Sequence, residues 1–114
     1  MHELGTVLYI IDTVEKTAEE HSLSEVSSVT VEVGEVSGIV PSYISDFWLY
    51  ARKNSALLAE TEMKIVTLPA VTFCEDCRGA YPTVQYGKRC PHCGSDKTYL
   101  LCGNEYNIKE IEGC

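Results

Sequence analysis

The feature that most constrains the fold is a pair of Cys-x-x-Cys motifs in the second half of the chain. The motifs read CEDC at residues 74–77 and CPHC at residues 90–93, with twelve residues between them. A two-residue gap lets a tight turn aim both thiolates at one ion, and two such turns complete a tetrahedral shell of four sulfurs. This shell suits structural Zn²⁺, so we predict a zinc site made of Cys74, Cys77, Cys90 and Cys93.

Other interpretations of these cysteines remain open from the sequence. A Cys-x-x-Cys pair also serves dithiol redox chemistry when it begins a helix after a strand, but here two pairs occur without a βαβ pattern around them. His92 is either a substitute metal ligand or an exposed loop residue. Cys102 and Cys114 lie outside the pairs and have no partner by spacing. Residues 79–89 are expected to form a hairpin that joins the two motifs.

Length and charge exclude several classes of protein. The chain has 114 residues and a formal net charge of −8 at pH 7, which is room for a small domain with a smaller module and argues against binding to nucleic acid or anionic lipid. No apolar run approaches the roughly 20 residues of a membrane span, and the start lacks the basic residues of a secretory signal. We therefore expect a soluble, cytoplasmic protein with reduced thiols and with neither nucleic-acid nor membrane partners.

Hydrophobic periodicity predicts the elements outside the cysteine motifs. Apolar residues recur at helical spacing over residues 4–20, and residues 28–33 alternate as in a half-buried strand. A second helix begins at Pro41, a second strand covers residues 63–68, and a third covers residues 105–112. The apolar residues of the two helices are Leu4, Val7, Leu8, Ile11, Val14 and Ala18 in the first and Tyr43, Ile44, Phe47, Trp48 and Ala51 in the second.

Residues 70–103 differ from the rest of the chain. They hold five of the six cysteines and four of the eight glycines but few aliphatic side chains, so this stretch needs a metal to fold. We predict an α+β protein in which two helices pack on a small three-stranded sheet, with a four-cysteine module like a zinc ribbon inserted before the last strand. Residues 1–69 and 104–114 then form one discontinuous domain, and residues 70–103 form the module.

The amino terminus offers a second set of metal ligands. The chain begins Met1-His2-Glu3, so the terminal amine, the following amide nitrogens and the His2 imidazole form a compact set of nitrogen donors. Nitrogen donors in a plane suit Ni(II) or Cu(II), and Glu3 adds a carboxylate oxygen or orients the imidazole. The alternative is that His2 is a polar residue preceding the helix and that Glu3 interacts with the helix dipole.

Four segments together resemble the HypA/HybF family of hydrogenase maturation factors. They are the start MHE, GEVSG at residues 34–38 followed by Val40-Pro41, the second motif extended to CPHCGS, and GNEYNIKEIE near the end. The resemblance implies a nickel metallochaperone with a nickel-binding α/β domain and a zinc domain inserted before the final strand. It also implies nickel ligands at Met1, His2 and Glu3, zinc ligands at Cys74, Cys77, Cys90 and Cys93, and no catalytic activity.

The resemblance further implies delivery of nickel to the large subunit of a [NiFe]-hydrogenase together with the GTPase HypB, and in some organisms to urease. The sequence leaves the oligomeric state open between a monomer and a homodimer. Two functions of other classes stay as alternatives, namely a zinc-ribbon adaptor for protein interactions and a nucleic-acid module that uses the basic and aromatic residues of the insert.

Overall fold

The computed structural model describes residues 2–114, which divide into two compact units. The helical unit contains the residues up to Glu32 together with Ile39–Val66 and Asn107–Cys114, and the cysteine unit contains Val33–Gly38 and Thr67–Tyr106. The module expected at residues 70–103 lies inside the cysteine unit, which also includes residues 33–38, 67–69 and 104–106. Within residues 2–114 no helix is long and apolar enough to cross a lipid bilayer.

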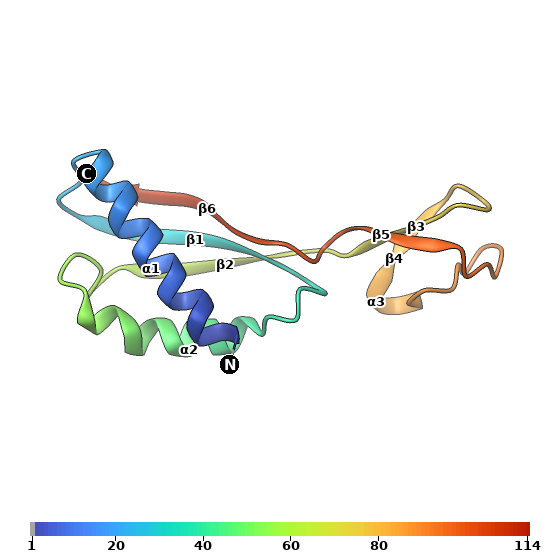
Figure 1. The fold of residues 1–114 in the computed structure, drawn as a ribbon, viewed down its shortest axis with the longest axis horizontal. Coiled ribbons are helices and arrows are strands. Elements are labelled where there is room, and N and C mark those ends of the chain that lie inside the picture. Colours follow the sequence, from blue (N-terminus) through green and yellow to red (C-terminus); the bar gives the residue numbers. More distant parts are fainter. Residues whose placement is uncertain (1) are drawn as a thin grey trace. The chain divides into compact units, whose positions relative to one another are not determined.

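A three-stranded sheet with both long helices on one face forms the first part of the fold (Figure 1), which confirms the predicted α+β class. The strand order is β2-β1-β6, so the last strand of the chain pairs with the first. The elements are α1 (His2–Glu20), β1 (Val26–Gly34), α2 (Pro41–Ala51), the 3-10 turn η1 (Arg52–Asn54), β2 (Glu62–Leu68) and β6 (Tyr106–Gly113).

Helix α1 buries the residues that recur at steps of three and four from Val7. These residues are Val7, Ile10, Val14 and Ala18, each no more than 1% exposed. The prediction that Leu8 belongs to this face is wrong, because Leu8 is 53% exposed. One residue advances a helix by about 100°, and this step carries Leu8 out of the buried face on which Val7 lies.

Helix α2 starts at Pro41, whose missing N–H costs nothing in a first turn. It packs against α1 and buries Ile44, Trp48 and Ala51, whereas Tyr43 is 53% exposed. The indole Nε1 of Trp48 donates a hydrogen bond of 2.9 Å to the Thr61 carbonyl oxygen. This bond satisfies the polar atom of the largest buried side chain and ties α2 to the residue before β2.

The cysteine unit is built on a second antiparallel sheet, in the order β4-β3-β5. Its elements are β3 (Val71–Cys74), β4 (Ala80–Pro82), the short helix α3 (Thr83–Tyr86) and β5 (Thr98–Cys102). The prediction of a hairpin within residues 79–89 is wrong, because β4 pairs with β3 and β3 pairs in turn with β5. The chain leaves β4 at Pro82 and turns into α3, so β4 is the only strand between the two motifs within residues 2–114, and its partner is β3, which ends at the first cysteine.

The core of the cysteine unit is very small, as its composition indicated. Within residues 70–103 the buried hydrophobic residues are Ala70, Cys74, Tyr81 and Cys90. The last three form one cluster, and two of those three are candidate metal ligands. Tyr81 also packs edge-on against Tyr86, with ring centroids 6.0 Å apart. So little apolar burial cannot offset the conformational entropy of about forty residues without a metal or another crosslink.

Two glycines permit a close backbone crossing where the chain enters and leaves the module. A Cβ atom at Gly34 would lie 2.1 Å from the Gly103 carbonyl oxygen, and one at Gly103 would lie 2.3 Å from the Ala70 Cα. Gly103 also has a φ of +106°, which favours glycine. The Val36 N–H donates a 2.8 Å hydrogen bond to the Gly103 carbonyl. The GEVSG segment therefore fastens the returning strand by backbone contacts.

Candidate metal centre

Four cysteine sulfurs meet at one end of the cysteine unit, as the motif spacing predicted. All four Sγ atoms lie within 4.8 Å of one another, with 3.5 Å between Cys74 and Cys93 and 3.6 Å between Cys77 and Cys90. Four tetrahedral sulfurs at about 2.3 Å from Zn²⁺ would lie about 3.8 Å apart. The observed spacing therefore fits a tetrahedral tetrathiolate site.

The two motifs form nearly equivalent loops. The N–H of Cys74 donates to the carbonyl of Gly79 at 2.8 Å, and the N–H of Cys90 donates to the carbonyl of Ser95 at 2.9 Å, so each loop closes five residues after its first cysteine. Each loop turns at its fifth residue with a positive φ, and these residues are Arg78 (59°) and Gly94 (72°). In each loop the first cysteine is buried and the second is exposed.

Backbone N–H groups in these loops point at the sulfurs and change their acidity. Burial raises the pKa of Cys90, but hydrogen bonds from the N–H groups of Cys93 and His92 outweigh it and lower the pKa to about 6. The Ser95 N–H lowers the pKa of Cys93, but proton sharing with Cys74 and the other thiols raises it to about 12. A divalent cation that binds the four sulfurs would displace their remaining protons.

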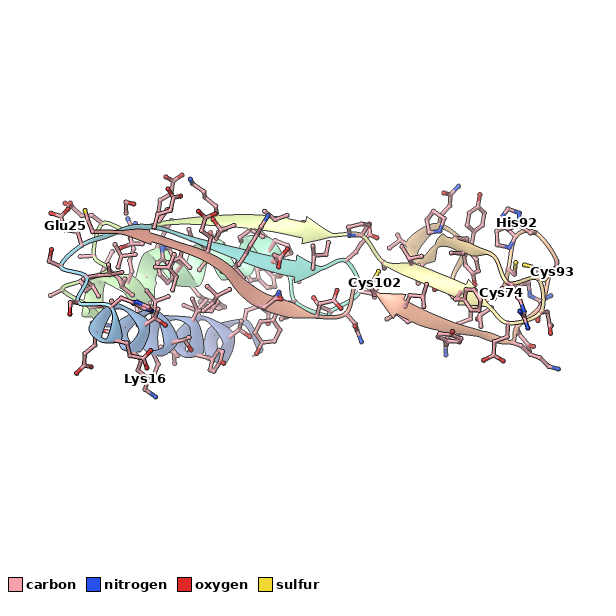
Figure 2. The ribbon with its side chains drawn as sticks, turned by 90° about the horizontal axis from the view of Figure 1, so that it is seen from above. Lys16, Glu25, Cys74, His92, Cys93 and Cys102 are labelled. Carbon is pink, nitrogen blue, oxygen red and sulfur yellow. The ribbon has the colours of Figure 1, made fainter. Side chains whose placement is uncertain are left out.

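The structure also bears on the alternative interpretations of the motifs. The cluster found within residues 2–114 contains the four cysteines and not His92, whose exposed side chain lies beside the site (Figure 2). The His92 N–H donates to Cys90 Sγ at 3.4 Å, so its backbone supports a ligand. Neither motif begins a helix in the part of the chain that is described, which removes the feature that activates a dithiol for redox chemistry.

The two remaining cysteines lie apart from the cluster. Cys102 is half-buried at the other end of the module (Figure 2), with its Sγ 3.7 Å from the Pro69 carbonyl oxygen. Cys114 is exposed, and its Sγ lies 4.0 Å from Glu25 Oε2. Neither residue adds a ligand to the four-sulfur site.

The amino-terminal candidates are described only in part. Met1 lies outside the described residues, and so does the side chain of His2. The backbone is helical from His2, two residues earlier than predicted, and the Glu3 side chain is 9% exposed. His2 therefore belongs to the first turn of α1, where backbone N–H groups have no acceptor within the helix.

One interaction between the two loops was not predicted from the sequence. The Ser95 hydroxyl, two residues after the second motif, donates a hydrogen bond to the Asp76 carboxylate inside the first motif. Serine after glycine is a common turn pair, which was the only signal in the sequence. The pairing itself depends on how the two loops meet.

Comparison with known proteins gives matches along the whole chain. The sequence model of the HypA family, described as hydrogenase/urease nickel incorporation, metallochaperone, matches residues 1–113. The hydrogenase maturation factor HypA of Dechloromonas aromatica (strain RCB) is 30% identical over 112 residues, which cover 98% of each chain. The hydrogenase maturation factor HybF of Klebsiella pneumoniae is 29% identical over 113 residues, which cover 99% of each chain.

Solved structures show the same fold. The solution structure of the Ni metallochaperone HypA from Helicobacter pylori matches with a TM-score of 0.70 and 23% identity, over 97% of this chain and 96% of that one. A second solution structure, of HypA protein, matches with a TM-score of 0.74 and 23% identity, over 100% of this chain and 97% of that one.

Proposed function

Because this chain belongs to the HypA family of hydrogenase maturation nickel metallochaperones, we propose that it binds Ni(II) through Met1, His2 and Glu3 and delivers the ion to the large subunit of a [NiFe]-hydrogenase. The observation that carries this proposal is the family match over residues 1–113. Delivery to urease is a second destination, which the description of the family includes. The protein acts by carrying an ion and catalyses no reaction.

The chemistry of the first residues supports nickel as the cargo. The terminal amine of Met1 and the His2 imidazole are nitrogen donors, and the amide nitrogens of a first helical turn are not engaged within the helix. Such a donor set favours the planar geometry of Ni(II) over the tetrahedral geometry of zinc. Glu3 follows His2 directly in the sequence and is 9% exposed, and its carboxylate is the third candidate ligand. Both nitrogen ligands must lose a proton, so acidification favours release.

The four-cysteine cluster is proposed to hold Zn²⁺ as a structural ion. Four thiolates leave no open coordination position, so the metal, when bound, crosslinks the two loops and takes no part in transfer. The ligands are Cys74, Cys77, Cys90 and Cys93. Zinc would thereby supply the stabilisation that the small core of the cysteine unit lacks.

The GTPase HypB is proposed as the partner in nickel delivery, and the cytoplasm as the site of action. The four clustered cysteines are free thiols, and thiols stay reduced in the cytoplasm. Co-purification of this chain with HypB and with the hydrogenase large subunit, carried out with and without added nickel, tests this part of the proposal. If neither complex forms, with or without added nickel, an adaptor with other partners is favoured.

The nickel site is tested by changing the start of the chain. One glycine placed before Met1 moves the amine away from the imidazole, and His2→Ala removes the imidazole. We expect each change to weaken nickel binding at pH 7 by at least about tenfold, since each removes a nitrogen ligand from a chelate. Isothermal titration of untagged protein with Ni(II) measures this, and zinc content measured in parallel reports the integrity of the second site.

The matched control is His21→Ala, which removes an exposed histidine just after the end of the same helix. This variant should keep the wild-type nickel affinity. If the extended chain and His2→Ala bind nickel as tightly as the wild type, the amino-terminal site is wrong.

A further inference from the structure

We propose that Asp76 and Ser95 form a clasp that holds the two cysteine loops in register for the metal, so that these two residues are positioning residues that set how slowly zinc leaves. Neither residue is a metal ligand. The proposal rests on the zinc site proposed above and adds a determinant of its stability. It follows from a comparison of the two loops, which match in backbone but differ in side chains.

The clasp joins residues of different loops. Asp76 is the third residue of the first loop, and its carboxylate accepts a hydrogen bond from the hydroxyl of Ser95, the last residue of the second loop. The Ser95 oxygen accepts in turn from the Lys97 N–H at 3.1 Å. Because its hydroxyl is engaged as both donor and acceptor, Ser95 has a fixed orientation.

The backbone next to the clasp strengthens the same connection. The N–H of Glu75 in the first loop donates a 2.9 Å hydrogen bond to the carbonyl of Lys97, which follows the second loop. The side-chain clasp and this backbone bond are therefore adjacent and hold the same two segments. Two residues separate the cysteines within each pair, but twelve residues separate the two pairs. The connection between the loops therefore determines whether the four sulfurs stay together.

The equivalent contact on the other side of the site lacks a hydrogen bond. Position three of the second loop is His92, and the last position of the first loop is Gly79, which has no side chain. A Cβ atom at Gly79 would lie 3.9 Å from Cδ2 of His92, so the same two positions approach each other without a polar partner. The site is thus clasped on one side only, and opening is expected to begin on the side of His92 and Gly79.

The clasp matters because the four-sulfur site is closed only while the two loops stay together. The four Sγ atoms, two from each loop, lie within 4.8 Å of one another. A hydrogen bond to a charged acceptor is stronger than one between neutral groups. Zinc can dissociate when one pair of cysteines separates from the other, and the clasp opposes that step.

The experiment measures zinc release from the full-length protein loaded with zinc. A chromophoric chelator in excess traps released zinc, and the rate is compared for the wild type, Asp76→Ala and Ser95→Ala. We expect either variant to speed release by about fivefold, the effect of one exposed charge-assisted hydrogen bond. The double variant should be no faster than either single one, because the two residues act as a pair.

Conservative variants distinguish loss of the hydrogen bond from loss of charge and from nonspecific disruption of the loop. Ser95→Thr keeps the hydroxyl and should release zinc at close to the wild-type rate. Asp76→Asn keeps an acceptor oxygen but loses the charge, so its rate should lie between those of the wild type and Asp76→Ala. Glu75→Ala is the matched control, because it removes a neighbouring carboxylate that forms no hydrogen bond or ion pair within residues 2–114. Its release rate should equal that of the wild type.

A spectroscopic measurement excludes loss of a ligand. Replacement of zinc by Co(II) gives absorption bands that depend on the number of bound thiolates, and these bands should be unchanged in Asp76→Ala and Ser95→Ala. Wild-type release rates in both alanine variants, or an equal acceleration in Glu75→Ala, would overturn the clasp. Failure of the wild-type protein to bind zinc would instead overturn the proposed zinc site.

Discussion

The helical unit and the cysteine unit have similar sheets but hold them together in different ways. Each is built on three strands, but the helical unit buries aliphatic side chains from two helices and a strand, whereas the buried cluster of the cysteine unit is one tyrosine and two cysteines. Apolar burial is available whether or not a metal is present, and thiolate ligation is not. The stability of the second unit should therefore depend on zinc and that of the first should not.

Removal of zinc should give the largest effect. A strong chelator at neutral pH should unfold residues 70–103, because ligation contributes roughly 10 kcal/mol or more to the folding of small zinc modules. Limited proteolysis with mapping of the cleavage sites detects this unfolding. The only tryptophan, Trp48, is buried in the helical unit, so its fluorescence should keep its folded value.

Cysteine variants provide the control for zinc removal. Cys90→Ser removes a buried ligand and should reproduce the proteolytic pattern, whereas Cys114→Ser should leave both units intact. If chelation shifts the fluorescence of Trp48 to its unfolded value while protease cleaves residues 70–103, the two units do not fold independently and the comparison fails.

A cavity in the helical unit should give an effect of intermediate size. Ile10→Ala deletes a side chain that is 1% exposed and should lower the free energy of unfolding by about 2 to 5 kcal/mol. Urea unfolding followed by Trp48 fluorescence measures the change, and zinc content should stay at the wild-type level. Leu8→Ala on the same helix is the control, since Leu8 is 53% exposed and its loss should change stability by less than about 0.5 kcal/mol.

The smallest effect is expected on the outer face of the first sheet. The Ser28 hydroxyl, which donates a 2.8 Å hydrogen bond, and the Lys64 ammonium lower the pKa of Glu112. A carboxyl group with a lower pKa in the folded state stabilises the protein above its unfolded pKa of about 4.3, and this stabilisation disappears as the pH falls through the folded pKa. Glu112→Gln should therefore be slightly less stable than the wild type at pH 7, and the difference should vanish in acid.

Urea titrations at several pH values, again with Trp48 as the probe, measure this dependence without interference from acid release of zinc. Glu110→Gln removes a carboxylate from the same strand that forms no ion pair within residues 2–114, and it should not show the trend. A stability difference for Glu112→Gln that grows as the pH falls would contradict the assignment.

Several parts of the fold could be predicted because they depend on local pattern. Alternation predicted a strand at residues 28–33, observed as β1 (Val26–Gly34), and a proline that suits a first turn predicted the helix at Pro41. The exposed side chain of Leu8 was not predicted, because a run of apolar residues defines a helix more clearly than it defines the centre of the buried face. The sequence did not predict that β3 and β5 are strands that pair with each other, because strand pairing depends on contacts between distant residues.

The sequence by itself determined which four cysteines come together, because the spacing of each Cys-x-x-Cys pair already allows both sulfurs to face one point. It also determined which residues form long helices, since the period of apolar side chains is a local property. Tertiary structure alone decided that the last strand pairs with the first, that Gly34 meets Gly103, and that Ser95 reaches Asp76. Each of these contacts joins residues far apart in the chain, so it forms only when the packing of whole elements brings them within a few ångströms.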